Sequence, residues 1–246
     1  MRTRSTTVAV SRLGVVVPAR NEREYLAGCL AALDRAAHVI RIPLEVVVVL
    51  DSCVDDSEAV ARAAARTLAC RVHVVTVDAS SVGTARRVGV QRLLEILDPV
   101  DDWVATTDAD SLVPRSWFRR QLAHRAAGAA MVAGTVHVPE WEDRSLLRPR
   151  WERQYLADGH RHVHGANLSF QASAYLRVGG FADVMSDEDV RLVAAFLAAG
   201  EDVVFASDLS VATSARRDGR APNGFAHYLN HLAGELDAPV PQLEHS

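Results

Sequence analysis

Two aspartates, Asp108 and Asp110, stand one residue apart in the stretch TTDADSLV, which follows an apolar run and precedes a proline. Two like charges side by side lower stability unless water or a positive charge compensates them. Hard divalent cations such as Mg²⁺ and Mn²⁺ prefer carboxylate, water and phosphate oxygens. The pair therefore predicts either a solvated turn or a cation site, and the surrounding elements decide where it lies.

Before this pair the chain alternates between strands and helices. Continuous apolar runs predict buried strands, and apolar residues at helical spacing predict helices. We expect strands over 13–20, 44–51, 70–78 and 101–110, and helices over 21–36, 57–68 and 84–97. This alternation is typical of an α/β protein with a mostly parallel sheet flanked by helices.

After Asp110 the pattern continues less regularly. We expect a helix over 115–128, a strand over 129–138 and a polar segment bearing Trp and Arg over 139–156. The segments 160–181, 185–200 and 202–217 complete the fold. We interpret residues 1–246 as one domain with a mobile tail over 238–246.

Composition excludes several classes of function. The net charge of -4 argues against a nucleic-acid partner. All 27 basic residues are Arg, so a Schiff-base lysine and a Walker-type phosphate loop are both excluded. The three cysteines form no CxxC motif, and no run is apolar enough to span a membrane. We expect a cytoplasmic protein without a membrane span.

Polar residues cluster where the expected strands end. Ligands of such sheets bind at the carboxyl ends of the strands. Each residue there also has a structural explanation: Asp51 could cap the next helix, Gly83 could form a turn, and Arg86 could be a solvated helix residue. Their occurrence after four successive strands favours a ligand site.

Six segments resemble, in order, motifs of the family 2 glycosyltransferases of the GT-A fold. They are VVVPARNE, VVVVLDSCVDDS, VGTARRVGV, TTDADS, HGANLSFQASAYLRVGGF and SDEDVRL, within residues 13–192, and TTDADS resembles the family's DxD motif. The resemblance implies a GT-A domain with a Rossmann-like nucleotide-binding half over 1–110 and an acceptor-binding half over 111–237. It also implies a nucleoside-diphosphate sugar donor, UDP favoured over GDP, and Mg²⁺ or Mn²⁺ as cofactor.

The resemblance also assigns the donor site. It places Asp110 on the metal, Asp108 on the ribose or a metal-bound water, and Asp51 on the imide N–H of a uracil. Glu22 would shape the nucleoside pocket, and Arg86 would point toward the diphosphate. The complete set of donor residues is Pro18, Ala19, Arg20, Asn21, Glu22, Asp51, Gly83, Arg86, Asp108, Ala109, Arg216 and Arg217.

In SDEDVRL the family pattern places a general base at Asp189, and the like charge of Glu188 beside it would help Asp189 take up a proton near neutrality. A base that removes the acceptor proton during a single displacement gives inversion at the anomeric carbon. The alternative is that Ser186, Asp187 and Glu188 cap a helix. The acceptor, which would be a small molecule, a lipid-linked compound or a glycan, would lie beside His164, Gly165, Ala166 and Asn167.

Two further segments have open interpretations. The Arg-rich TSARRDGR could close over the diphosphate through Ser214, Arg216 and Arg217, or could be a solvated loop; the QxxRW motif of processive synthases is absent. The histidines at 160, 162 and 164 would share one face of a strand, where zinc is conceivable and acceptor binding is preferred.

Two other functions compete with sugar transfer. A sugar nucleotidyltransferase would share the strand and helix alternation, but its GxGTR start and catalytic Lys are missing. A non-catalytic module that binds nucleotide sugars would differ from the enzyme only in lacking the base.

Overall fold

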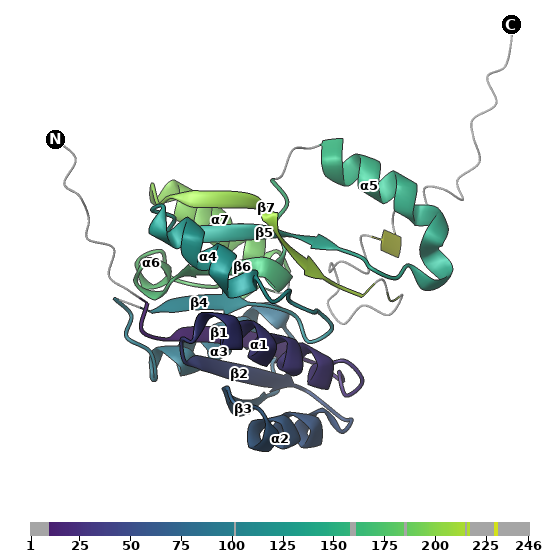
Figure 1. Ribbon diagram of the computed structural model, residues 1–246, viewed down its shortest axis with the longest axis horizontal. Coiled ribbons are helices and arrows are strands. Elements are labelled where there is room, and N and C mark those ends of the chain that lie inside the picture. Colours follow the sequence, from purple (N-terminus) through teal and green to yellow (C-terminus); the bar gives the residue numbers. More distant parts are fainter. Residues whose placement is uncertain are drawn as a thin grey trace, which may run out of the picture.

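The computed structural model describes residues 10–100, 102–157, 161–184, 186–214, 216 and 229–230. Within them, seven strands form one sheet in the order β3-β2-β1-β4-β6-β5-β7 (Figure 1). Their bounds are β1 Leu13–Ala19, β2 Leu44–Asp51, β3 Arg71–Val77, β4 Trp103–Thr106, β5 Met131–His137, β6 Leu168–Gln171 and β7 Val203–Ala212. Strand β6 pairs antiparallel with β4 and β5, and the other pairs are parallel. The mostly parallel α/β sheet is confirmed.

Helices cover both faces of this sheet. One face packs on α1 Leu26–Ile40, α2 Ser57–Thr67 and α4 Trp117–Ala126, and the other on α3 Val82–Leu94, α6 Ala172–Arg177 and α7 Glu188–Ala198. The side chains of β1 alternate between the two cores, with Val15 and Val17 on the first and Val16 on the second. Burying each such side chain contributes roughly 1.5–3 kcal/mol, which fixes the strands that carry the site.

A third, smaller apolar cluster lies beyond the ends of β5 and β7, where α5 is drawn in Figure 1. The 3-10 helix η1 Glu142–Leu147 and the helix α5 Arg148–Ala157 occupy the segment expected only to be polar. Trp141, Trp151 and Leu229 pack together there. No helix within the described ranges has the length and apolar character needed to cross a membrane.

The prediction of a helix from residue 21 was wrong at its start. Helix α1 begins at Leu26, because the chain first makes a turn in which Asn21 has a φ of 56° and Val54 donates its N–H to the Asn21 side chain. The left-handed conformation at Asn21 interrupts a right-handed helix. The turn leaves residues 20–25 at the edge of the sheet.

The fourth strand is shorter than predicted. It ends at Thr106, and the chain then turns so that the N–H of Ser111 donates to the carbonyl of Asp108 at 3.0 Å. An isolated bridge joins Leu112 to Ala212. Asp108 and Asp110 therefore lie on a turn after the strand. The other predicted helices and strands differ from the structure by about three residues or fewer at their ends, and the expected tail over 238–246 lies outside the described residues.

Candidate active site

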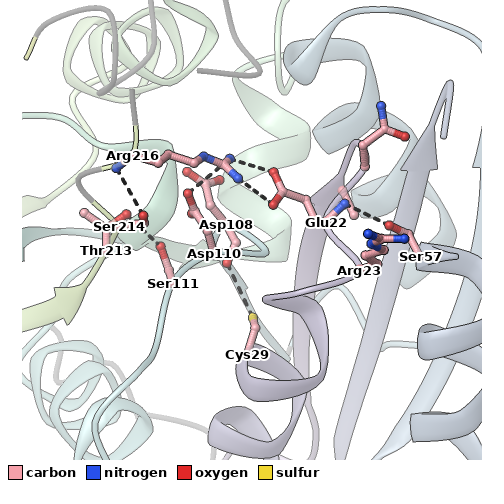
Figure 2. Close-up of polar contacts among 12 residues, drawn as sticks. Glu22, Arg23, Cys29, Ser57, Asp108, Asp110, Ser111, Thr213, Ser214 and Arg216 are labelled. Atoms are coloured by element: carbon pink, nitrogen blue, oxygen red, sulfur yellow. Dashed lines mark hydrogen bonds and ion pairs between the residues drawn. The ribbon is translucent and has the colours of Figure 1, made fainter. Parts of the chain in front are cut away.

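The loops after β1 and β2 are bonded to each other at the carboxyl edge of the sheet. Val54 donates its N–H to Oδ1 of Asn21 at 2.8 Å, and Glu22 donates its N–H to the Ser57 hydroxyl at 2.8 Å. The Glu22 side chain is buried and extends toward the turn after β4 (Figure 2). The sequence between β1 and α1 thus presents a carboxylate to the end of a strand that lies far along the chain.

Asp51 anchors the loop after β3. Its Oδ1 accepts hydrogen bonds from the N–H groups of Ala79 and Ser80 at 2.9 Å and from the Ser52 hydroxyl at 3.0 Å. Its Oδ2 accepts one from the N–H of Ser81 at 3.0 Å and, among the described residues, no other. A carboxylate oxygen can accept two, so Oδ2 retains one acceptor position. The carboxylate does not cap helix α2, which was the structural alternative.

Glu22, Asp110 and Arg216 form a cluster of charges beside the turn after β4 (Figure 2). Arg216 donates to both carboxylate oxygens of Glu22 at 2.6 Å and lies 3.1 Å from Oδ2 of Asp110. Burial raises the pKa of Asp110 to about 7; Arg216 opposes this rise, whereas Asp108 and Glu22 add to it. One guanidinium therefore leaves this cluster with an excess of negative charge.

Arg86 joins Asp108 to the start of α7. Its side chain is buried, Nη2 donates to Oδ1 of Asp108 at 2.5 Å, and Nη1 donates to Oε1 of Glu188. Burial lowers the pKa of Arg86, but the carboxylates of Asp108, Glu188 and Asp189 outweigh it and raise the pKa above its usual value. Burial likewise raises the pKa of Glu188, and Arg86 offsets part of that rise. The shared guanidinium fixes the turn after β4 against α7.

Asp189 lies in the first turn of α7 and is tied to the loop before β6. Its Oδ2 accepts the N–H of Gly165 at 2.7 Å, and the Gly165 carbonyl accepts the Thr106 hydroxyl at 2.6 Å. A Cβ on Gly165 would lie 2.4 Å from Cζ of Arg86, so only glycine lets this loop pack on the guanidinium. The Gly165 loop thus holds Asp189 and packs on Arg86, which pairs with Asp108.

The Asn167 side chain, expected beside the acceptor, points into the protein core. Its side chain is fully buried and bonds within the core, where Oδ1 accepts from Trp117 at 2.9 Å and Nδ2 donates to the carbonyls of Thr135 and Leu209 at 2.8 and 2.9 Å. It joins helix α4 to strands β5 and β7. Ala166 is also buried.

His164 and His162 pack on Tyr155 of α5. The ring of His162 stacks on Tyr155 with 4.1 Å between centroids, and Nε2 of His164 lies 3.2 Å from the Tyr155 hydroxyl. Residues 161–164 are not a strand, contrary to the expectation, and the third histidine lies outside the described residues. In the described part of the chain, no three His, Cys, Asp or Glu side chains are grouped to hold a metal.

The remaining predicted donor residues lie around this edge. Pro18 and Ala19 end β1, Arg20 follows them with partial exposure, and Ala109 is buried between the two aspartates. A Cβ on Gly83 would lie 3.0 Å from Cβ of Glu188, so glycine allows the start of α3 to pack against α7. Arg217 lies outside the described residues.

The cation implied by the sequence is compatible with these side chains. The available oxygens are carboxylates, the ligand type that Mg²⁺ and Mn²⁺ prefer. Three of them belong to Glu22, Asp108 and Asp110, which pair with Arg216 or Arg86, and Arg86 is shared with Glu188. The two aspartates could hold a cation if donor phosphates and water supply the remaining ligands.

A family model described as Glycosyl transferase family 2 matches residues 14–176, more than half of the chain. The chain belongs to glycosyltransferase family 2. The match includes the turn after β4 and the loop at Gly165, and the family suggested by the sequence is confirmed. This family 2 glycosyltransferase is therefore an enzyme of the GT-A type.

Solved structures show the same fold. The mannosyltransferase PcManGT from Pyrobaculum calidifontis, solved with GDP-Man and Mn²⁺, matches with a TM-score of 0.66 and 20% identity over 92% of this chain and 70% of its own. TarS 1-349 from S. aureus, solved with UDP-GlcNAc, matches with a TM-score of 0.63 and 16% identity over 93% of this chain and 68% of its own. Glucosyl-3-phosphoglycerate synthase from Mycobacterium tuberculosis was solved with Mn²⁺, UDP and phosphoglyceric acid. It matches with a TM-score of 0.59 and 16% identity over 94% of this chain and 80% of its own. No curated protein sequence matches the chain.

Three side chains of the family 2 enzyme's site were not anticipated from its sequence. The Arg216 guanidinium lies 5.6 Å from the centre of the Tyr25 ring, and Arg144 donates to the Arg216 carbonyl at 3.2 Å. Thr106, the last residue of β4, holds the Gly165 carbonyl. Tyr25 and Arg144 lie outside the recognised motifs, and only the position of Thr106 just before the aspartates could have indicated its role.

Proposed function

We propose that this glycosyltransferase moves a sugar from a nucleoside-diphosphate sugar to an acceptor hydroxyl with inversion at the anomeric carbon. The donor would lie along the carboxyl ends of β1 to β4, the edge where ligands of such sheets bind. Asp51 would accept the imide N–H of a uracil through the remaining acceptor position on Oδ2, which favours UDP as the nucleotide. The nucleotide sugars bound by PcManGT and TarS support this class of donor.

Asp108 and Asp110 would lie at the diphosphate. A bound Mg²⁺ or Mn²⁺ would neutralise the charge that develops on the leaving diphosphate. Arg86 is buried between Asp108 and Glu188, so it would hold the aspartate turn in place instead of contacting the phosphates. Arg216 lies beside Asp110 and would be the guanidinium nearest the diphosphate.

Asp189 would be the general base. Its carboxylate is oriented by the N–H groups of Gly165 and Val190, at 2.7 and 2.8 Å. It would take the proton of the acceptor hydroxyl as that oxygen attacks opposite the leaving diphosphate. The acceptor would lie between α7 and α5, beside His164 and Gly165.

A single observation carries this proposal. Arg86 and Gly165 connect the aspartate turn, where the leaving group would bind, to Asp189, where the acceptor would be deprotonated. A base and a leaving-group site held by neighbouring elements match the needs of a single displacement.

The experiment is a panel of UDP-, GDP- and ADP-sugars incubated with the enzyme and Mn²⁺, with release of the nucleoside diphosphate as the readout. We expect release from at least one UDP-sugar and binding of UDP at least about tenfold tighter than ADP, because a hydrogen bond to a charged group contributes roughly 1.5–3 kcal/mol. Equal affinities for UDP and ADP would contradict the role of Asp51. Binding without any sugar release would instead support a non-catalytic module.

A further inference from the structure

Arg216 contacts one carboxylate oxygen of Asp110, the residue proposed above to bind the cation. Its two terminal nitrogens contact both oxygens of Glu22 at 2.6 Å, and Nη2 also lies 3.1 Å from Oδ2 of Asp110 (Figure 2). The side chains of Glu22 and Asp110 are 5% and 12% exposed. A charge in so shielded a place interacts strongly with a second cation nearby.

The two contacts of Arg216 differ in kind. The pair with Glu22 is bidentate and short, which is the strong geometry of an arginine and a carboxylate. The contact with Asp110 is single and longer. The contact with Asp110 is therefore the one that a competing cation would break first.

The backbone of Arg216 is held while its side chain reaches the site. The N–H of Thr213 donates to the His137 carbonyl at 2.9 Å, and its hydroxyl accepts from Ser111 at 3.3 Å. The Arg216 carbonyl accepts from Arg144 at 3.2 Å. Thr213 lies only three residues before Arg216, so the chain keeps Arg216 within roughly 10 Å of Thr213 when the contact with Asp110 breaks.

These observations give Arg216 a role in donor binding that rests on the function proposed above. We propose that Arg216 makes cation binding depend on the nucleotide: its guanidinium competes with the divalent ion for Asp110, stays paired with Glu22 when the ion binds, and becomes a favourable neighbour of the ion only when a diphosphate supplies negative charge between them. Binding of the cation and of the nucleotide is then coupled, and the coupling is reciprocal.

The test measures Mn²⁺ binding directly, from the loss of the free Mn²⁺ signal in electron paramagnetic resonance, with and without UDP. For the wild type we expect UDP to tighten Mn²⁺ binding at least about tenfold. For Arg216→Gln, Mn²⁺ alone should bind at least about fivefold tighter than to the wild type, and UDP should tighten it much less. For Arg216→Lys, which keeps the positive charge, Mn²⁺ alone should bind as weakly as to the wild type.

Arg177→Gln is the matched control, because Arg177 pairs with Glu201 at 2.7 Å outside this cluster. It should reproduce the wild-type values. Equal affinity for Mn²⁺ alone in the wild type and in Arg216→Gln, or no coupling to UDP in the wild type, would overturn the proposal without requiring any variant to transfer sugar. Coupling observed without cleavage of any nucleotide sugar would support the role of Arg216 and count against catalysis, so the two proposals fail separately.

Discussion

At the scale of single residues, Asp189 and Glu188 are neighbours with different surroundings. Glu188 is buried and pairs with Arg86, whereas Asp189 is partly exposed and accepts the N–H of Gly165. Burial and pairing make Glu188 a structural anchor for the start of α7. The partly exposed carboxylate of Asp189 is the one that an acceptor hydroxyl could approach.

Replacing Asp189 by Asn should reduce turnover by about 10²- to 10⁴-fold, the usual contribution of a general base, while UDP affinity stays within about twofold. Steady-state kinetics and calorimetry check the two parts. The control is Asp187→Asn, which makes the same change of charge at an exposed residue and should retain turnover. An Asp187 variant as damaged as the Asp189 variant would point to helix capping as the shared role.

Asp110 should give Mn²⁺ binding a dependence on pH. Its pKa is raised to about 7 in the folded protein, so the carboxyl is protonated at pH 6 and charged at pH 8. Its contribution to stability is present below the unfolded pKa near 4 and is lost as pH rises through about 7. Thermal unfolding without metal should therefore show the wild type losing stability relative to Asp110→Asn between about pH 4 and 7.

Addition of Mn²⁺ with UDP should reverse that loss for the wild type. The increase in unfolding temperature should grow from pH 6 to pH 8, because the metal competes with the proton for the carboxylate. Asp110→Asn should show little effect of Mn²⁺ at either pH. An equal effect of Mn²⁺ on the wild type and the variant at pH 8 would remove Asp110 from the proposed cation site.

The sequence indicated which polar residues follow the strands, but it did not indicate which side chains they pair with. Asp108, Asp110 and Asp189 were found from local motifs, and the structure pairs Asp108 with Arg86, Asp110 with Arg216 and Asp189 with the N–H of Gly165. The pair of Glu22 and Arg216 joins residues 194 positions apart, so no local pattern could predict it. Asn167 belongs to the same motif as Gly165, but its burial depends on the packing of β5, β7 and α4, which spacing does not reveal.

At the scale of elements, helix α3 connects the sheet core to the site. It packs on β1 and β2 through Gly89, and its first turn packs against α7 through Gly83. A Cβ at Gly89 would lie 2.3 Å from Cγ1 of Val16, a branched side chain that has little room to move. The close approach of α3 to the sheet therefore requires a residue without a side chain.

Replacing two helical glycines by alanine should change the free energy of unfolding in opposite directions. Gly89→Ala should lower the free energy of unfolding by about 1–3 kcal/mol, as overpacking of a core does. Gly28→Ala on α1 should raise it by about 0.5–1 kcal/mol, because a Cβ there lies 3.6 Å from Cδ2 of Leu112, an ordinary contact, and alanine favours helix. Urea denaturation of both variants checks the pair, and a stabilised Gly89 variant would contradict the packing described for α3.

Element types were more predictable than element ends. The strand over 44–51 is fully buried and the strand over 71–77 carries four partly buried valines, and both were recognised nearly to the residue. Helix α1 starts late because a left-handed turn at Asn21 and a bond from Val54 precede it, and neither is visible in apolar spacing. Helix α5 was missed because its sequence RPRWERQYLA is mainly polar, and its packing comes from two tryptophans and Leu229.

At the scale of the whole molecule, strands from before and after the aspartate turn form one sheet. Strand β6 alone among the described strands runs against its neighbours, and it sits between β4 and β5. This insertion brings the Gly165 loop, which precedes β6, beside the end of β4. The Gly165 loop in turn contacts Asp189 of α7, so the aspartate turn and α7 come close together. The alternation of strands and helices in the sequence does not predict this arrangement.

The stereochemistry of donor cleavage tests the proposed single displacement most directly. The enzyme would be incubated with Mn²⁺ and α-linked UDP-sugars in water, which serves as a slow acceptor, and the anomeric proton of the released sugar would be followed by NMR before the anomers equilibrate. A single displacement assisted by Asp189 predicts that the β-anomer appears first. Initial release of the α-anomer, or no cleavage of any nucleotide sugar that binds, would contradict it.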